Sequence, residues 1–327
     1  MKATARAHPI QGIVKYHGLR DEERRLPYHD SISVCTAPSA TVTTVAFEAD
    51  RGEDAYVVDC EDVSGRGAER IRAVVDAVRE RAGIDDAVRL VSENSFPTNV
   101  GLGSSSSGFA AAAMALVAAA DLDLSRPEVS TIARLGSTSA ARSVTGGFSI
   151  LRAGLNDDDC RSRRIEGEGA RDLEADLRVV VGLVPAYKET ESAHAEAADS
   201  PMFEARLAHV HGQLAEGLDA IRAGDFDRTF ELAEHDSLSL AATTMTGPAG
   251  WVYWQPETLA IFEVVRDLRD SGVPVYFSTD TGATVYVNTT AEHAARVEDA
   301  IAGLGVETSV WGVGGPAEVL AADEALF

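Results

Sequence analysis

A glycine- and serine-rich stretch follows a β-branched segment that ends near residue 92 and leads into an alanine-rich run. It reads PTNVGLGSSSSG over residues 97–108, and residues 109–120 continue without proline or glycine. This order predicts a strand, a loop and then a helix. The first amides of a helix lack acceptors, glycines admit a ligand close to the backbone, and serine hydroxyls add donors. The chemistry that the stretch favours is polyphosphate binding.

Two common phosphate-binding motifs do not match this stretch. It has no lysine, as a Walker A loop requires, and no third glycine at the spacing of a dinucleotide fingerprint. A serine-capped buried helix is the structural alternative. The stretch resembles the P-x-x-x-G-L-G-S-S-A-A loop of the GHMP kinase superfamily, which holds ATP phosphates. That resemblance implies nucleotide contacts from Gly101, Gly103, Ser104, Ser105 and Ser106.

Three charged side chains, far apart in the sequence, each stand among apolar, small or turn residues. Lys15 follows two apolar residues, where an ammonium needs an anionic partner unless it reaches solvent from a strand edge. Arg142 lies in a run of small residues, where capping helix carbonyls is the ordinary role. Asp280 precedes Gly282 after a β-branched run, where a turn aspartate is ordinary. Taken singly, each residue has a structural explanation.

Together, these segments resemble the mevalonate diphosphate decarboxylase family, a branch of the GHMP superfamily. Four blocks match family motifs in order: residues 10–33 (N-I-A-x-x-K-Y-W-G-K-R-D and its continuation), 92–105 (S-E-N-N-F-P-T-x-x-G-L-A-S-S), 136–147 (G-S-G-S-A-C-R-S-x-x-G-G) and 279–282 (D-A-G region). The resemblance implies an α+β GHMP kinase fold, ribosomal S5-like in its N-terminal part and ferredoxin-like in its C-terminal part. It places the nucleotide-binding domain at residues 1–175 and the C-terminal domain at 176–327.

The resemblance also implies a reaction. ATP phosphorylates the tertiary 3-hydroxyl of a mevalonate phosphate, and loss of that phosphate together with CO₂ leaves an alkene. Asp280 would accept or orient the hydroxyl proton, Arg142 would hold the C1 carboxylate, and Lys15 would neutralise charge on the transferred phosphoryl group. ATP and Mg²⁺ are the implied cofactors. The sequence shows no cluster of metal ligands, so we expect the ion to arrive with the nucleotide.

One departure from the family motif concerns the substrate. The second lysine of K-Y-W-G-K is Leu19 here, and the tryptophan is His17. In the family this lysine reaches the 5-diphosphate, so its replacement removes a cation from that end of the pocket. We therefore expect mevalonate 5-phosphate as substrate and isopentenyl phosphate as product, as in a haloarchaeal type of the enzyme. The 5-diphosphate, giving isopentenyl diphosphate, is the alternative, because Arg20 or His17 could supply the missing charge.

Three further residues have smaller implied roles, and three other functions are alternatives. The resemblance places Tyr16 and Ser139 at the substrate phosphate and Ser192 in a phosphate-side loop. Alternative functions are a kinase that stops after 3-phosphorylation, an ATP-independent decarboxylase of a bisphosphorylated mevalonate, and a non-enzymatic binding protein. Arg142 and Asp280 disfavour the first, the serine-rich loop disfavours the second, and the co-occurrence of Lys15, Arg142 and Asp280 disfavours the third.

The charge balance indicates where the protein works. The net charge is −23, from 52 acidic and 29 basic residues, and only three of the basic residues are lysine. Acid excess along the whole chain is typical of a surface kept soluble in very high salt, where screening weakens self-repulsion. This composition predicts a halophile's cytoplasm and argues against nucleic-acid or membrane partners. The N-terminus has no apolar signal segment, and the family resemblance suggests a homodimer that binds a small-molecule substrate.

Hydrophobic periodicity predicts the elements that position these residues. The expected strands are residues 32–34, 41–47, 86–92, 177–184, 273–278, 284–288 and 306–310. The expected helices are residues 68–81, 109–120, 127–135, 201–223, 225–243, 256–271 and 291–304. Residues 156–172 are charged and glycine-bearing, so we expect an exposed connection there. Helices between paired strands indicate an α+β fold.

Overall fold

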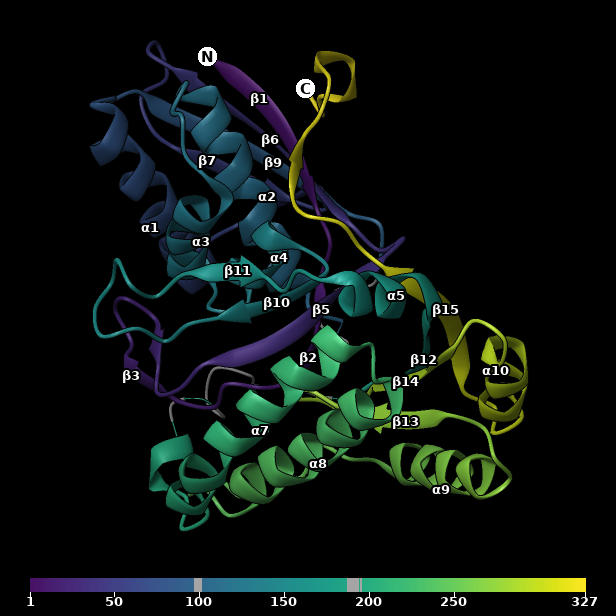
Figure 1. The fold of residues 1–327 in the computed structure, drawn as a ribbon. Coiled ribbons are helices and arrows are strands. Elements are labelled where there is room, and N and C mark those ends of the chain that lie inside the picture. Colours follow the sequence, from purple (N-terminus) through teal and green to yellow (C-terminus); the bar gives the residue numbers. More distant parts are fainter. Residues whose placement is uncertain (97–101, 187–193, 195) are drawn as a thin grey trace.

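The structure is a computed structural model that describes residues 1–96, 102–186, 194 and 196–327. A six-stranded sheet forms the upper part of the molecule (Figure 1). Its order is β16 (Glu318–Val319), β1 (Lys2–Ala7), β6 (Thr41–Glu48), β9 (Ala87–Asn94), β7 (Ala55–Val58) and β8 (Glu61–Asp62). Helices α1 (Gly65–Ala82), α2 (Ser104–Ala119) and α3 (Arg126–Gly136) share a hydrophobic core with this sheet. The alanines of α2 let that helix lie close to β1 and β6.

An eight-stranded sheet forms the lower part. Its order is β11 (Ser162–Arg164), β10 (Phe148–Leu151), β5 (Ser31–Ala37), β15 (Glu307–Val313), β12 (Leu177–Leu183), β14 (Val285–Thr290) and β13 (Val275–Ser278), with β2 (Ile10–Val14) paired to β5. Side chains alternate along β12: Val179 and Val181 pack with α7 (Phe203–Ala223) and α8 (Phe226–Met245), whereas Val180 packs with α9 (Pro256–Asp270) and α10 (Ala294–Ala302). The two helix pairs therefore cover opposite faces. The predicted α+β class is confirmed.

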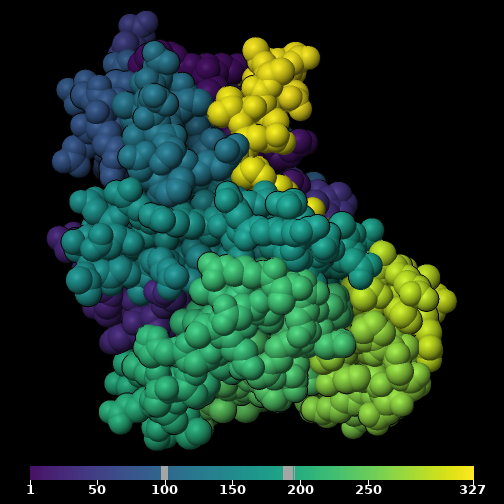
Figure 2. Space-filling view, viewed as in Figure 1, coloured from purple at the N-terminus to yellow at the C-terminus, as the bar shows by residue number. Residues whose placement is uncertain are grey.

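The C-terminal part of the chain returns to the N-terminal part. β15 pairs with β5 through Gly312–Ala37 and Val313–Thr36, and β16 then pairs with β1. The last residues, yellow in Figures 1 and 2, consequently lie beside the purple N-terminal strand at the upper end of the molecule. The larger sheet thus contains strands from both sides of the boundary predicted near residue 175, and the division into two domains stays a prediction.

Two predicted segments differ from the structure. The helix expected from residue 109 begins at Ser104, with Gly103 as its N-cap residue, because glycine and serine are both favoured at helix N-termini. The connection expected over residues 156–172 contains β11 and the beginning of α5 (Glu168–Asp176). Cys160 and Ile165 are buried there while the arginines of β11 point outward, so the charged composition concealed a short strand. Among the described residues, no helix is long and apolar enough to cross a membrane.

Candidate active site

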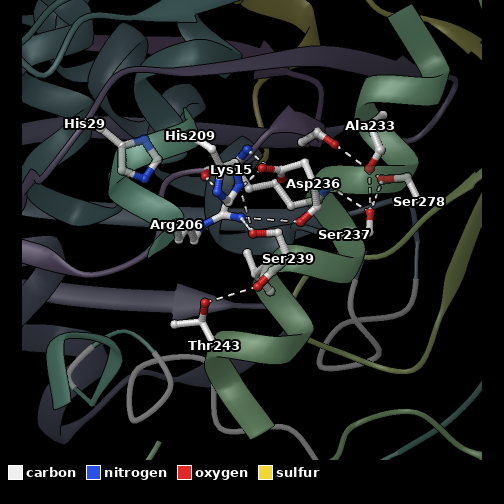
Figure 3. A network of polar contacts seen from close by, with 12 residues as sticks. Lys15, His29, Arg206, His209, Ala233, Asp236, Ser237, Ser239, Thr243 and Ser278 are labelled. Carbon is white, nitrogen blue, oxygen red and sulfur yellow. Dashed lines mark hydrogen bonds and ion pairs between the residues drawn. The ribbon is translucent and has the colours of Figure 1, made fainter. Parts of the chain in front are cut away.

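β2 brings Lys15 into the interior of the molecule. Lys15 follows the last residue of the strand, and only 5% of its side chain is exposed. Its Nζ donates to Ser237 Oγ at 3.1 Å and lies 3.4 Å from Asp236 Oδ2, both on α8 (Figure 3). A buried ammonium group needs such partners. Lys15 is therefore not a lysine that reaches solvent from a strand edge.

Asp236 is shared between Lys15 and Arg206 of α7. Its Oδ2 accepts from the backbone N–H of Lys15 at 3.0 Å, and its Oδ1 accepts from Arg206 Nη2 at 2.8 Å. The same Nη2 donates to the carbonyl of Lys15 at 2.6 Å. Burial acts to raise the pKa of Asp236, but the guanidinium and the ammonium, with these hydrogen bonds, hold that pKa below its usual range. The carboxylate stays ionised and fixes the end of β2.

Asp280 lies in the turn after β13, close to the end of β2. The N–H of Gly282 donates to its backbone carbonyl at 3.0 Å and closes the turn. A Cβ built on Gly12 would lie 3.1 Å from Asp280 Oδ1 and 2.5 Å from Lys15 Cγ, so glycine at this position allows the close approach. Burial lowers the pKa of Lys15, and the carboxylates of Asp236 and Asp280 oppose that shift. The side chains of Lys15 and Asp280, which the sequence predicts to act in one reaction, therefore lie near each other.

Arg142 completes this arrangement from α4 (Ala140–Thr145). Only 3% of the residue is exposed, its guanidinium donates to Ser31 Oγ, and its Cζ lies 5.5 Å from the centre of the Tyr16 ring. Burial lowers the pKa of Arg142, and electrostatic interactions with Tyr16 and Asp280 oppose that shift. Its Nε has no hydrogen-bond partner in the described part of the chain. A buried guanidinium with an unpaired N–H suits an anionic group such as a carboxylate.

The serine-rich loop lies at the other end of β2. Gly103 has φ +74°, and Ser106 Oγ donates to its carbonyl at 2.7 Å while accepting from the N–H of Ile10 at 3.2 Å. Ser106 thus fixes the start of α2 to the strand that leads to Lys15. Ser105 is exposed and Ser104 half-buried, and the described residues supply no acceptor for their amides. These amides at a helix N-terminus suit a phosphate.

The remaining predicted residues fall into two groups. Tyr16 is buried and stacks on His194, with 4.8 Å between the ring centroids. Ser139 is the N-cap residue of α4, three residues before Arg142, and its Oγ lies 2.8 Å from Ser137 Oγ. Gly101 and Ser192 lie outside the described residues. The site assignments of all these residues stay predictions.

Comparison with known proteins identifies the family. The family described as Diphosphomevalonate decarboxylase-like N-terminal domain matches residues 7–162. The chain is also 72% identical over 328 residues to the phosphomevalonate decarboxylase of Haloferax volcanii, and the match covers 100% of each chain. This chain belongs to the diphosphomevalonate decarboxylase-like family.

Solved structures of related decarboxylases have the same fold. The mevalonate diphosphate decarboxylase of Staphylococcus aureus matches with a TM-score of 0.92 and 30% identity over 98% of both chains. A complex of MDDEF with MVAPP, AMPPCP and magnesium matches with a TM-score of 0.92 and 28% identity, over 98% of this chain and 99% of that one. These similarities confirm the family and the GHMP kinase fold predicted from the sequence.

Arg206, Asp236 and Ser237 were not predicted as members of the site. They lie in helices that the sequence shows only as amphipathic, and their pairing with Lys15 spans 191 to 222 residues. A signal is nevertheless present. Asp236 and Ser237 fall on the buried face of α8, at helical spacing from Phe230, Ala233 and Leu240. A carboxylate on an apolar helix face predicts a buried cation as its partner.

Proposed function

We propose that this chain converts mevalonate 5-phosphate to isopentenyl phosphate, with ATP consumed and ADP, phosphate and CO₂ released, in isoprenoid biosynthesis. The observation that carries the proposal is that the buried Lys15 and Arg142 both lie near the half-buried Asp280 beside the end of β2. The 72% identity to a phosphomevalonate decarboxylase supports the choice of substrate. ATP-dependent release of CO₂ distinguishes this function from a kinase and from a binding protein.

The first step is phosphorylation of the tertiary 3-hydroxyl. Asp280 accepts the hydroxyl proton, and the oxygen attacks the γ-phosphorus of ATP while the bond to the leaving ADP breaks. Lys15 stabilises the charge on the transferred phosphoryl group. Phosphoryl transfer needs mainly positioning and electrostatic stabilisation, which a buried ammonium between two carboxylates supplies.

The second step is fragmentation. The C3–O bond breaks and phosphate leaves with the electron pair, while the C1–C2 pair becomes the C2=C3 double bond and CO₂ departs. Arg142 holds the C1 carboxylate so that the C1–C2 bond aligns with the leaving group. Its place against Tyr16 and its unpaired Nε support this role.

The nucleotide fits the beginning of α2. The backbone amides of Ser104 and Ser105 would hold its phosphates, and the left-handed Gly103 leaves room beside Ile10. Mg²⁺ bound with ATP neutralises phosphate charge. Within the described residues, no three Asp, Glu, His or Cys side chains are grouped as a metal site. The proposed ion is therefore assigned no ligand set from this chain.

The residues after Lys15 bear on the number of substrate phosphates. Leu19 is half-buried at the start of β3 (Leu19–Asp21), which pairs with β4 (Leu26–Pro27). The Arg20 guanidinium donates to four carbonyls, those of Pro27, Ala153, Gly154 and Leu155, at 2.9–3.1 Å. These bonds hold the Arg20 guanidinium against the backbone, which supports the proposal that Arg20 does not replace the lysine of the family motif. This favours a substrate with one phosphate.

Leu19→Lys is expected to shift the substrate preference toward the 5-diphosphate. A new charged hydrogen bond should raise the diphosphate-to-monophosphate ratio of kcat/KM by about tenfold. The assay compares both substrates in parallel. Leu304→Lys adds the same charge at an exposed position after α10 and should leave the ratio unchanged. An unchanged ratio in Leu19→Lys would mean that position 19 does not discriminate.

The 5-diphosphate is the second candidate substrate. It is favoured by the similarity to the mevalonate diphosphate decarboxylase of Staphylococcus aureus, with a TM-score of 0.92. Competition between the two substrates in molar salt decides the question. The proposal requires the higher kcat/KM for mevalonate 5-phosphate, and a higher value for the diphosphate would reassign the substrate.

We also propose that the protein is adapted to high salt, as its net charge of −23 suggests. Screening weakens the repulsion between acidic side chains, so the unfolding temperature should rise between about 0.1 M and about 2 M KCl. Thermal unfolding followed by circular dichroism measures this. A lower unfolding temperature at the higher salt concentration would contradict it. A cytoplasmic location and a homodimeric state stay predictions.

A further inference from the structure

Asp236 and Ser237, adjacent on α8, both contact the Lys15 ammonium, and neither takes part in a bond-making step of the proposed mechanism (Figure 3). We propose that they are positioning residues, which keep the Lys15 ammonium charged and placed beside Asp280 for phosphoryl transfer. This inference rests on the proposed function and extends it. In this proposal Ser237 positions the Lys15 ammonium, and Asp236 keeps it protonated.

The hydroxyl of Ser237 links the Lys15 ammonium to the backbone next to Asp280. Its Oγ accepts from Lys15 Nζ at 3.1 Å and from the backbone N–H of Thr279 at 3.1 Å, and it donates to the carbonyl of Ala233 at 2.7 Å. A serine hydroxyl has one proton and two acceptor positions, which these three bonds fill, and a longer contact of 3.3 Å to Ser278 Oγ competes for the same proton. Because Thr279 directly precedes Asp280, the hydroxyl ties the ammonium to the turn that carries the carboxylate.

Asp236 balances the charge of two buried cations. Its side chain and that of Arg206 are 0% and 1% exposed, and that of Lys15 is 5% exposed. An uncompensated charge in such a place is costly, and an ammonium relieves that cost by losing its proton. Asp236 therefore opposes the loss of the Lys15 proton, whereas Arg206 promotes it.

The groups that face the Lys15 ammonium come from three elements. They are Asp236 on α8, Arg206 on α7 and Asp280 after β13. His29, before β5, faces Arg206 and Asp236, and burial lowers its pKa to about 4, so it is neutral at neutral pH. Burial lowers the pKa of Lys15, Asp236 and Asp280 act against that shift, and Arg206 adds to it. Neutralising Asp236 and neutralising Arg206 must consequently move this pKa in opposite directions.

The small number of lysines makes the test direct. The chain has three lysines, Lys2, Lys15 and Lys188, so a protein labelled with ¹³C at the lysine ε-carbon gives three signals. Lys15→Arg assigns the Lys15 signal by its loss. A pH titration of the folded protein then reports the pKa of Lys15, and Lys2 serves as an internal reference.

Two variants give the decisive comparison. Asp236→Asn should lower the Lys15 pKa by about one unit or more, and Arg206→Gln should raise it. The high-pH limb of kcat/KM, where Lys15 loses its proton, should move in the same directions. If Asp236→Asn does not fold, the rise in Arg206→Gln alone decides. Unchanged titration in the folded variants, or shifts of the same sign, would overturn the proposal, because loss of structure alone has no reason to give opposite signs.

Ser237→Ala separates position from charge. It should lower kcat/KM by about tenfold or more, because a hydrogen bond to a charged group is lost. The Lys15 pKa should fall less than in Asp236→Asn, because the hydroxyl carries no charge. Wild-type kcat/KM in this variant would remove Ser237 from the proposal. Glu231→Gln is the matched control, since Glu231 lies on α8 and pairs with Arg228 at the surface, 44% exposed. Its activity and its Lys15 titration should match the wild type.

The two proposals fail in distinguishable ways. If the wild-type protein releases no CO₂ while the Lys15 pKa shifts as expected, the proposed function fails and the control of the ammonium by α8 stands. If CO₂ is released and the titrations of the variants coincide, only the positioning proposal fails.

Discussion

Asp280→Asn is expected to lower kcat by about 10² to 10⁴, the usual contribution of a general base. Asparagine keeps the size of the side chain but cannot accept the proton of the 3-hydroxyl. It also removes a negative charge that opposes the lowering of the Lys15 and Arg142 pKa values. Both changes weaken phosphoryl transfer. Single-turnover measurement of ADP formation tests this step directly.

Nucleotide binding provides the internal control for this variant. ATP is proposed to bind at the beginning of α2, so the Kd for ATP should remain near the wild-type value. Asp270→Asn removes an exposed carboxylate at the end of α9 and should leave kcat unchanged. Wild-type turnover in Asp280→Asn would exclude Asp280 as the base.

Arg142→Ala is expected to raise KM and lower kcat, so that kcat/KM falls by about 10² to 10³. The truncated side chain no longer holds the C1 carboxylate, and the fragmentation step loses its alignment. Arg142→Lys keeps one charge but not the planar pair of donors, so we expect it to recover only part of the loss. Steady-state kinetics of both variants measure the effect.

Free guanidinium ion offers a further control for this position. In Arg142→Ala it should restore part of the activity, whereas Arg222→Ala, at an exposed position near the end of α7, should behave as the wild type. Unchanged kcat/KM in Arg142→Ala would show that another group holds the carboxylate.

The sequence predicts the residues that lie in motifs and the elements with clear periodicity. Lys15, Arg142 and Asp280 were each ambiguous alone, and the structure places all three at the end of β2. The strands β5, β6, β9, β12, β13, β14 and β15 followed from runs of β-branched residues. The other strands of both sheets, including β1 and β2, were not predicted. The common location of the three charged residues depends on the pairing of β2 with β5, which no local sequence pattern encodes.

The parts of the site that the sequence did not predict depend on contacts between segments that are distant in the chain. Asp236 and Arg206 are ordinary residues of amphipathic helices until α7 and α8 pack on β2. Ser106 was predicted to contact the nucleotide, yet its hydroxyl is bonded to Gly103 and Ile10, so the described contacts give it a structural role. A small polar residue such as serine can bind either a ligand or a backbone group. The sequence pattern around it is the same in both cases.

The most direct test of the account is the stoichiometry of the wild-type reaction with mevalonate 5-phosphate and ATP in molar salt. If Lys15, Arg142 and Asp280 form one pocket that carries out both steps, ADP, phosphate and CO₂ should appear in equal amounts, with isopentenyl phosphate as the organic product. Formation of ADP without CO₂, or release of CO₂ without ATP, would contradict it.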